Sequence, residues 1–152
     1  INNLVENLKW HLNNLNINVD NGPSIYELAE SLRERSASLV DMAQSCVMFY
    51  CDFEAFDSVQ ANKVFNTKSR PILEDLVVNL NLIDSWTDKN IHSVIKIVCE
   101  KNDVGFGQVG QPFRLALSGD GKSGSIDVSA EFVGKERTLA RLEKAIDWIN
   151  KL

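Results

Sequence analysis

The chain has 152 residues, of which 44% are hydrophobic and 24% are charged, and this balance predicts a globular protein of one domain or two small ones. No apolar run reaches the roughly 18–20 residues of a membrane span, and no N-terminal signal segment is recognisable, which predicts a cytoplasmic protein. The net charge of −5 argues against broad phosphate binding, because a basic face is the usual mark of a nucleic-acid-binding protein. Residues 1–76 carry six Lys and Arg against eleven Asp and Glu, and residues 77–152 carry ten against ten, so any phosphate-binding surface must be local.

The first half of the sequence has the apolar spacing of helices. One apolar face predicts an opening helix over residues 1–15. Residues 19–24 predict a turn that begins a second helix, with Pro23 near its first position. This second helix continues to Met42, and we expect it to break near residues 36–38. Residues 52–57 predict a linker. The sequence starts at Ile1 without an initiator methionine, which indicates a fragment or a processed product.

Three further helices are predicted in the second half. Residues 71–83 have helical apolar spacing, and Thr87 is a good N-cap for a helix that continues to Val98. Gly134 separates the last two segments, and residues 136–152 predict an amphipathic closing helix. No segment alternates cleanly between apolar and polar residues, and no hairpin turn lies between two such segments. The sequence therefore predicts an all-α fold.

Two glycine-rich segments are similar to phosphate-binding motifs. Residues 105–110 match the dinucleotide-binding fingerprint letter for letter, but the preceding segment has helical spacing where that motif needs a strand. Residues 119–123 are similar to a phosphate loop, yet the position of the motif's first glycine is Ala116 and no buried strand precedes it. We interpret the first segment as a helix boundary and the second as a loop between helices.

No set of residues has the pattern of a catalytic or metal-binding site. His11 and His92 lie far apart along the chain with no nucleophile beside them, so we expect surface or capping roles. The three cysteines lack the spacing of a disulfide framework or a metal clip, which predicts free thiols. Four aromatic residues could stack on bases or fill a core between two helical lobes, and we interpret them as core: Phe49, Tyr50, Phe53 and Phe56.

Three stretches of the sequence carry a more specific pattern. They are residues 32–50, the segment Asp84-Ser85-Trp86-Thr87, and residues 107–119, which read GQVGQPFRLALSG; residues 134–137 and an Arg-Leu-Glu segment at 141–143 follow. In this order they resemble the anticodon-binding region of bacterial glutamyl-tRNA synthetases, which are class I synthetases. The second stretch resembles the family's Asp-Trp-Thr helix start with one residue inserted. The third is similar to the family's Gly-x-Val-x-Gln-Pro-Leu-Arg-x-Ala-Leu-Thr-Gly segment.

The resemblance implies that an anticodon lies between two helical lobes with its bases apart. Arg35 matches the family arginine that reads the third anticodon nucleotide and separates glutamate from glutamine tRNAs, and Arg114 matches a second arginine that contacts the anticodon. Ser123, Gly124 and Ile126 match positions that contact anticodon bases, where the family commonly has Thr-Pro-x-Leu. A planar guanidinium with several donors suits this role, because it can fork onto a base edge. The alternative for Arg35 is an ion pair at the protein surface.

The resemblance also implies two helical subdomains, residues 1–50 and 51–152, without the nucleotide-binding catalytic domain, since the family's His-Ile-Gly-His and Lys-Met-Ser-Lys-Ser sequences are missing. We expect no catalytic residue, metal site or cofactor in this chain. The parent protein would attach L-glutamate to tRNA(Glu) with ATP and magnesium, as a monomer that contacts neither DNA nor membrane. Two alternatives stay open. One is a ligase that also charges tRNA(Gln), which Arg35 opposes; the other is a helical protein-interaction module without an RNA role, which the acidic charge favours.

Overall fold

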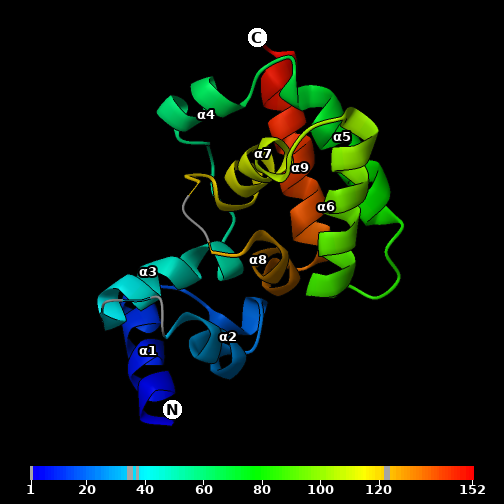
Figure 1. Ribbon diagram of the computed structural model, residues 1–152. Helices are drawn as coiled ribbons and strands as arrows, with labels where there is room; N and C mark the ends of the chain where they lie inside the picture. Colours follow the sequence, from blue (N-terminus) through cyan, green and yellow to red (C-terminus); the bar gives the residue numbers. More distant parts are fainter. Residues whose placement is uncertain (1, 34–35, 37, 122–123) are drawn as a thin grey trace. The chain divides into compact units, whose positions relative to one another are not determined.

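All regular structure in the described part of the chain is helical. The computed structural model describes residues 2–33, 36, 38–121 and 124–152. Its helices, shown in Figure 1, confirm the predicted all-α fold. They divide between two compact units, Ile1–Phe53 (unit 1) and Glu54–Leu152 (unit 2). The assignment of functional subdomains to residues 1–50 and 51–152 stays a prediction. None of the helices described is long and apolar enough to cross a membrane.

Unit 1 contains α1 (Asn2–Asn14), the short 3₁₀ helix η1 (Val19–Asn21), α2 (Ile25–Leu32) and α3 (Leu39–Tyr50). The predicted break in the second helix is confirmed, because α2 ends at Leu32 and Ser38 caps the start of α3 by accepting a hydrogen bond from the backbone N–H of Asp41. The predicted turn before α2 packs against the end of α3. There the Tyr50 hydroxyl donates a hydrogen bond to the backbone oxygen of Pro23 at 2.9 Å.

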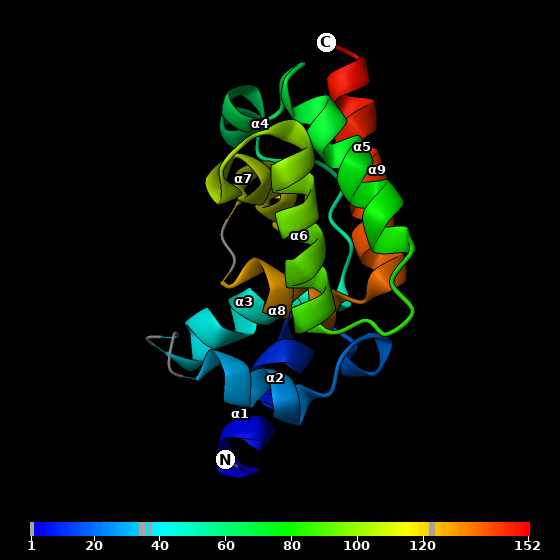
Figure 2. The same ribbon diagram turned by 45° about the vertical axis from the view of Figure 1, so that its right-hand side comes forward.

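Unit 2 contains α4 (Ser58–Val64), α5 (Ser69–Asn81), α6 (Asp88–Asn102), α7 (Phe106–Ser118), α8 (Ile126–Val133) and α9 (Lys135–Asn150). Helix α9 packs along α5, and α6 and α7 lie beside this pair, as the two views in Figures 1 and 2 show. Helix α4 was not predicted from the sequence. This helix has seven residues and buries only Ala61, so it has no apolar face that could be recognised as a helical period.

Local sequence signals place several helix ends in unit 2. The Thr87 hydroxyl accepts a hydrogen bond from the backbone N–H of Asn90 and caps α6 as predicted. Gly134 ends α8 and precedes α9 with a φ of 95°, a conformation that favours glycine, and the predicted separation of these two segments is confirmed. Gly105 is the N-cap of α7 and follows a helix, so the interpretation of the false dinucleotide fingerprint as a helix boundary is confirmed.

Three of the four aromatic residues around the predicted linker lie in the core of the unit to which each belongs. Phe49 and Tyr50 are 3% and 2% exposed in unit 1. Phe56 is 8% exposed in unit 2, where its ring lies 5.0 Å from that of Phe65 in an edge-to-face arrangement. These three rings therefore do not offer an open face for stacking on a base.

Candidate nucleic-acid interface

The start of α8 and one face of α7 bring together three of the five predicted site residues. Arg114 lies on α7, Gly124 precedes α8, and Ile126 is the first residue of α8. An Nη2 nitrogen of Arg114 donates to the backbone oxygen of Gly124 over 3.4 Å. The other two predicted site residues, Arg35 and Ser123, lie outside the residues that the structure describes.

A close approach between α7 and α8 sets the position of Ile126. Gly110 lies one turn before Arg114 on α7, and a Cβ atom at Gly110 would come within 3.1 Å of Cδ1 of Ile126. The absence of a side chain at Gly110 lets the isoleucine lie directly on the helix backbone. Ile126 is 3% exposed, so most of its side chain serves this packing.

Arg114 is half-buried and keeps most of its donors unused. A guanidinium has five N–H donors, and the hydrogen bond to Gly124 uses one of them. The Nε of Arg114 is buried without a hydrogen-bond partner among the described residues. Leaving a buried donor unpaired costs about 1–3 kcal/mol, which an acceptor brought by a ligand could partly offset after a small movement of the side chain. The site is therefore suited to an acceptor-rich ligand.

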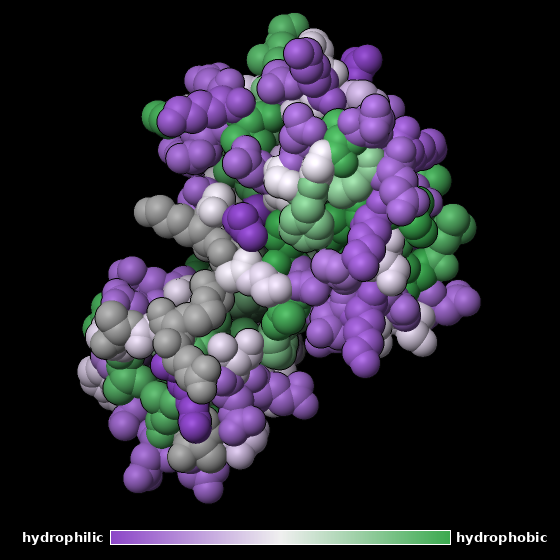
Figure 3. All heavy atoms as spheres, viewed as in Figure 1, coloured by the Kyte–Doolittle hydropathy of each residue, from purple (hydrophilic) through white to green (hydrophobic). Residues whose placement is uncertain are grey.

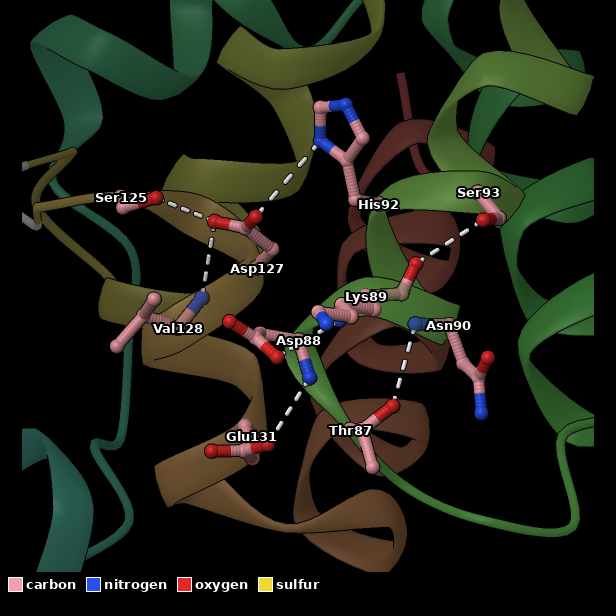
Figure 4. A network of polar contacts seen from close by, with 10 residues as sticks. All are labelled: Thr87, Asp88, Lys89, Asn90, His92, Ser93, Ser125, Asp127, Val128 and Glu131. Carbon is pink, nitrogen blue, oxygen red and sulfur yellow. Dashed lines mark hydrogen bonds and ion pairs between the residues drawn. The ribbon is translucent and has the colours of Figure 1, made fainter.

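The start of α6 holds α8 in place, as Figure 4 shows. The backbone N–H of Asp88 donates to Oε1 of Glu131 at 2.9 Å. One turn later, Nδ1 of His92 lies 3.7 Å from Oδ2 of Asp127, which belongs to the first turn of α8. Just before α6, the indole N–H of Trp86 donates to the backbone oxygen of Ala130 at 2.9 Å.

These contacts give a structural role to the Asp84-Ser85-Trp86-Thr87 segment. It places an indole and a helix start against α8, and α8 in turn carries Ile126. From the sequence, the segment is only part of a family pattern, and neither Trp86 nor Glu131 has a predicted role. Their roles depend on a contact across more than 40 positions of the chain, which a local pattern does not reveal.

His92 has a surface role and no catalytic geometry. The Ser125 hydroxyl donates to Asp127, while His92 contacts the same carboxylate and lies with its ring 5.8 Å from that of Phe106. A serine nucleophile would need its hydroxyl hydrogen-bonded to the histidine, with the carboxylate behind. In this arrangement the serine contacts the carboxylate instead.

Two basic residues of α9 bind the C-terminal ends of neighbouring helices. Nη1 of Arg141 donates to the backbone oxygen of Leu117 at 2.6 Å, and the side chain is 4% exposed. Nζ of Lys135 donates to the backbone oxygens of Asn81 and Ile83, at the end of α5. A positive charge is stabilising at a helix C-terminus, because the last carbonyl groups carry a partial negative charge. These two residues hold α9 against the ends of α7 and α5, and α7 carries Arg114.

The thiols and carboxylates do not form a metal centre in the described part of the chain. No three His, Cys, Asp or Glu side chains are grouped there as metal ligands. All three cysteines are free, and burial raises the pKa of the Cys46 thiol to about 12. Cys46 is therefore protonated and unreactive at neutral pH.

Comparisons with known proteins agree on one family. A model of the family described as "Anticodon binding domain" matches residues 3–146. The chain is 47% identical over 148 residues to a glutamate–tRNA ligase of Vesicomyosocius okutanii, and 45% identical over 147 residues to one of Ruthia magnifica. Each alignment covers 97% of this chain and 32% of the relative, so the chain spans about a third of the length of these relatives.

Solved structures show the same fold. A glutamate tRNA ligase of Elizabethkingia meningosepticum, solved in complex with its amino acid, is similar with a TM-score of 0.84 and 23% identity, over 97% of this chain and 29% of that chain. The glutamate-tRNA synthetase of Elizabethkingia anophelis is similar with a TM-score of 0.79 and 23% identity, over 96% of this chain and 28% of that one.

Proposed function

Because this chain belongs to the anticodon-binding domain family, we propose that it reads the anticodon of tRNA(Glu) within a glutamate–tRNA ligase. The observation that carries the proposal is the half-buried Arg114, whose guanidinium lies against the Gly124 backbone with donors to spare. RNA is read mainly at single-stranded loops, where unstacked bases expose their edges to such donors. Arg35 and Ser123, matched by resemblance alone, complete the proposed site.

The whole ligase would join L-glutamate to tRNA(Glu) in the cytoplasm with ATP and magnesium, as a monomer. This chain would supply the check on tRNA identity, and the nucleotide-binding chemistry would belong to the rest of the ligase. The similarity to two glutamate–tRNA ligases over 97% of this chain supports this division.

A binding titration at low salt tests anticodon reading. It compares tRNA(Glu) with the same tRNA altered only at the third anticodon base. We expect tighter binding of the unaltered tRNA, by about 5- to 150-fold, since one well-aligned contact to a base discriminates by about 1–3 kcal/mol. Equal binding of both would limit the chain to backbone contacts. No binding of either would favour the protein-interaction module instead.

Arg35 decides between the discriminating ligase and one that also charges tRNA(Gln). In the same titration we expect Arg35→Gln to reduce the preference at the third anticodon base, with a circular dichroism spectrum that shows an intact fold. Arg33→Gln is the matched control, two positions earlier in the sequence. Unchanged discrimination in a folded Arg35→Gln variant would remove this arginine from the site.

A further inference from the structure

Unit 2 has a polar cavity apart from the site around Arg114. It is a cavity of about 260 Å³ between α4, the start of α5 and the first turns of α7. Six polar side chains line it: Lys63, Asn66, Lys68, Ser69, Gln108 and Gln111. The side chains of Ile72 and Pro112, both buried, form an apolar part of its wall.

The charge of this cavity is opposite to that of the chain as a whole. The chain carries 21 Asp and Glu against 16 Lys and Arg, yet two lysines and no carboxylate line the cavity. Lys63 and Lys68 are exposed, and within the described residues neither lies within 4 Å of a carboxylate. Lys101, by contrast, is paired with Asp75 at 3.1 Å. Two unneutralised ammonium groups on one concave surface attract an anion.

The amide side chains add donors. Oδ1 of Asn66 accepts hydrogen bonds from the backbone N–H groups of Lys68 and Ser69, at 2.9 and 3.1 Å. Oε1 of Gln108 likewise accepts from the backbone N–H of Gly105 at 3.2 Å. Because these bonds occupy the amide oxygens, the NH₂ ends are the groups still available to a ligand. The cavity therefore offers many donors and few acceptors.

We propose that this cavity binds a backbone phosphate of RNA, with the attached ribose against Ile72 and Pro112. Phosphate oxygens are strong acceptors without donors and match this lining. The volume lies just below the ~300 Å³ at which small-molecule sites begin, which suits a phosphate and its sugar better than a whole cofactor. The proposal rests on the proposed function, because it assigns a second contact to the same tRNA.

Helix α7 connects the cavity to the Arg114 site. Gln108, Gln111 and Arg114 follow one another at intervals of three residues, and each interval advances about 4.5 Å along a helix. Residues three apart are neighbours on a helix surface, so Gln111 lies next to Arg114. A strand whose base contacts Arg114 can therefore place a neighbouring phosphate in the cavity. Figure 3 shows hydrophilic side chains gathered over α4, at the outer edge of this region.

The test removes the two positive charges and keeps the size of the side chains. The variant Lys63→Gln/Lys68→Gln is compared with Lys89→Gln/Lys96→Gln, which neutralises two exposed lysines of α6. Affinity for a tRNA(Glu) transcript is measured from 50 to 200 mM salt. We expect the first variant to bind about tenfold more weakly at low salt. The slope of its log K against log salt should fall in magnitude by about 0.7, the value for one lost phosphate contact to single-stranded RNA. The control should change neither by a comparable amount.

The preference for the native anticodon separates the two proposals. If the cavity holds a phosphate, the first variant loses affinity and keeps its discrimination at the third anticodon base. Equal affinity of the cavity variant and the control, with discrimination intact, would overturn the proposed phosphate site and would still support anticodon reading. Loss of tRNA binding in the unmodified chain would overturn both.

A free nucleotide is the other source of the same chemistry. Uridine 3′,5′-bisphosphate is titrated while the side-chain amide signals of Gln108 and Gln111 are followed by NMR. Weak binding that disappears in Lys63→Gln/Lys68→Gln, together with the tRNA result above, supports the phosphate site. Tight binding of the bisphosphate, without an effect of the variant on tRNA affinity, would assign the cavity to free nucleotides and overturn the RNA contact.

Discussion

A single residue can be suited to a ligand, as we propose for Arg114, or be required by packing, as Gly22 is. Arg114 is half-buried and keeps unused donors, which is unfavourable for stability and useful for binding. Gly22 has an ordinary extended φ of −156°, so a glycine is required there by space alone. A Cβ at Gly22 would lie 2.5 Å from the backbone oxygen of Phe49 and 2.7 Å from Cδ1 of Tyr50.

Arg114→Lys keeps the positive charge and removes the planar fork. We expect its affinity for tRNA(Glu) to fall by about 5- to 150-fold, because one ammonium cannot replace two parallel N–H donors on a base. Arg137→Lys is the matched control, since Arg137 is also a half-exposed arginine of unit 2. Full affinity of Arg114→Lys would reduce the contact to simple charge attraction.

Gly22→Ala should destabilise unit 1 by about 1–3 kcal/mol, the usual range for overpacking, since backbone atoms on the other side cannot move aside easily. Chemical denaturation followed by NMR signals of unit 1 measures the change. Gly107→Ala is the control: it lies in α7 with nothing within 4 Å of the added Cβ. For Gly107→Ala we expect unit 2 to gain about 0.5–1 kcal/mol of stability, followed by NMR signals of that unit, because alanine loses less backbone entropy in a helix.

At the scale of helices, the site depends on how α8 is attached. Helix α8 has eight residues, too short to be stable alone, and it takes its position from α6, α7 and α9. Three polar contacts connect it to Trp86, Asp88 and His92, at the start of α6 and just before it. Loss of one of these contacts should loosen α8 and so change the positions of Ile126 and Gly124, although neither of these residues is substituted.

Trp86→Phe removes the indole N–H that binds the Ala130 oxygen and keeps an aromatic ring. We expect a loss of about 0.5–1.5 kcal/mol, the net contribution of a typical hydrogen bond, and faster amide hydrogen exchange in α8. Trp148→Phe is the matched control, because Trp148 is also half-buried but lies on α9 with its ring 5.7 Å from that of Phe65. Equal exchange of α8 in both variants would show that the Trp86 contact does not hold this helix.

At the scale of the whole molecule, the chain is acidic, but two lysines and no carboxylate line the proposed phosphate site. This local charge is how an acidic chain would bind RNA. The net charge of −5 limits non-specific attachment, and the cavity between α4, α5 and α7 would offer its donors to one particular phosphate. Two buried groups of unit 1 have raised pKa values. In unit 1, burial raises the pKa of the Cys46 thiol, and burial followed by repulsion from Cys46 raises the pKa of Tyr50.

Unit 1 should lose stability in alkaline solution. The folded unit keeps the Cys46 proton up to a pKa of about 12, whereas the unfolded chain releases it near 9.0. The stabilisation is therefore complete below about pH 9 and declines as pH rises toward 12, by about 1.4 kcal/mol for each pH unit. Urea titrations between pH 8 and 10.5, followed by methyl signals of Leu8 and Leu28, measure this slope. Cys46→Ala should flatten it; an equal slope in this variant would assign the effect to other groups.

Helix type and many helix ends could be predicted from neighbouring residues. Thr87 and Gly134 act through atoms three or four positions away, so the sequence was sufficient to place α6 and to separate α8 from α9. Helix α4 was missed because it buries one side chain and has no period. For the site, Arg114, Gly124 and Ile126 were named by resemblance, but their mutual distances were not available from the chain order.

Three conclusions therefore follow from the sequence by itself. The protein is all-helical, its dinucleotide fingerprint is false, and a family resemblance covers the chain. Local hydrogen bonds and apolar periodicity act over a few residues, and these can be recognised without a structure. Tertiary structure alone decided which lysines are paired: Lys101 lies 3.1 Å from Asp75 of another helix, whereas Lys63 and Lys68 have no carboxylate within 4 Å in the described part. A cavity forms from segments more than 30 positions apart, and its charge depends on which side chains the packing brings together.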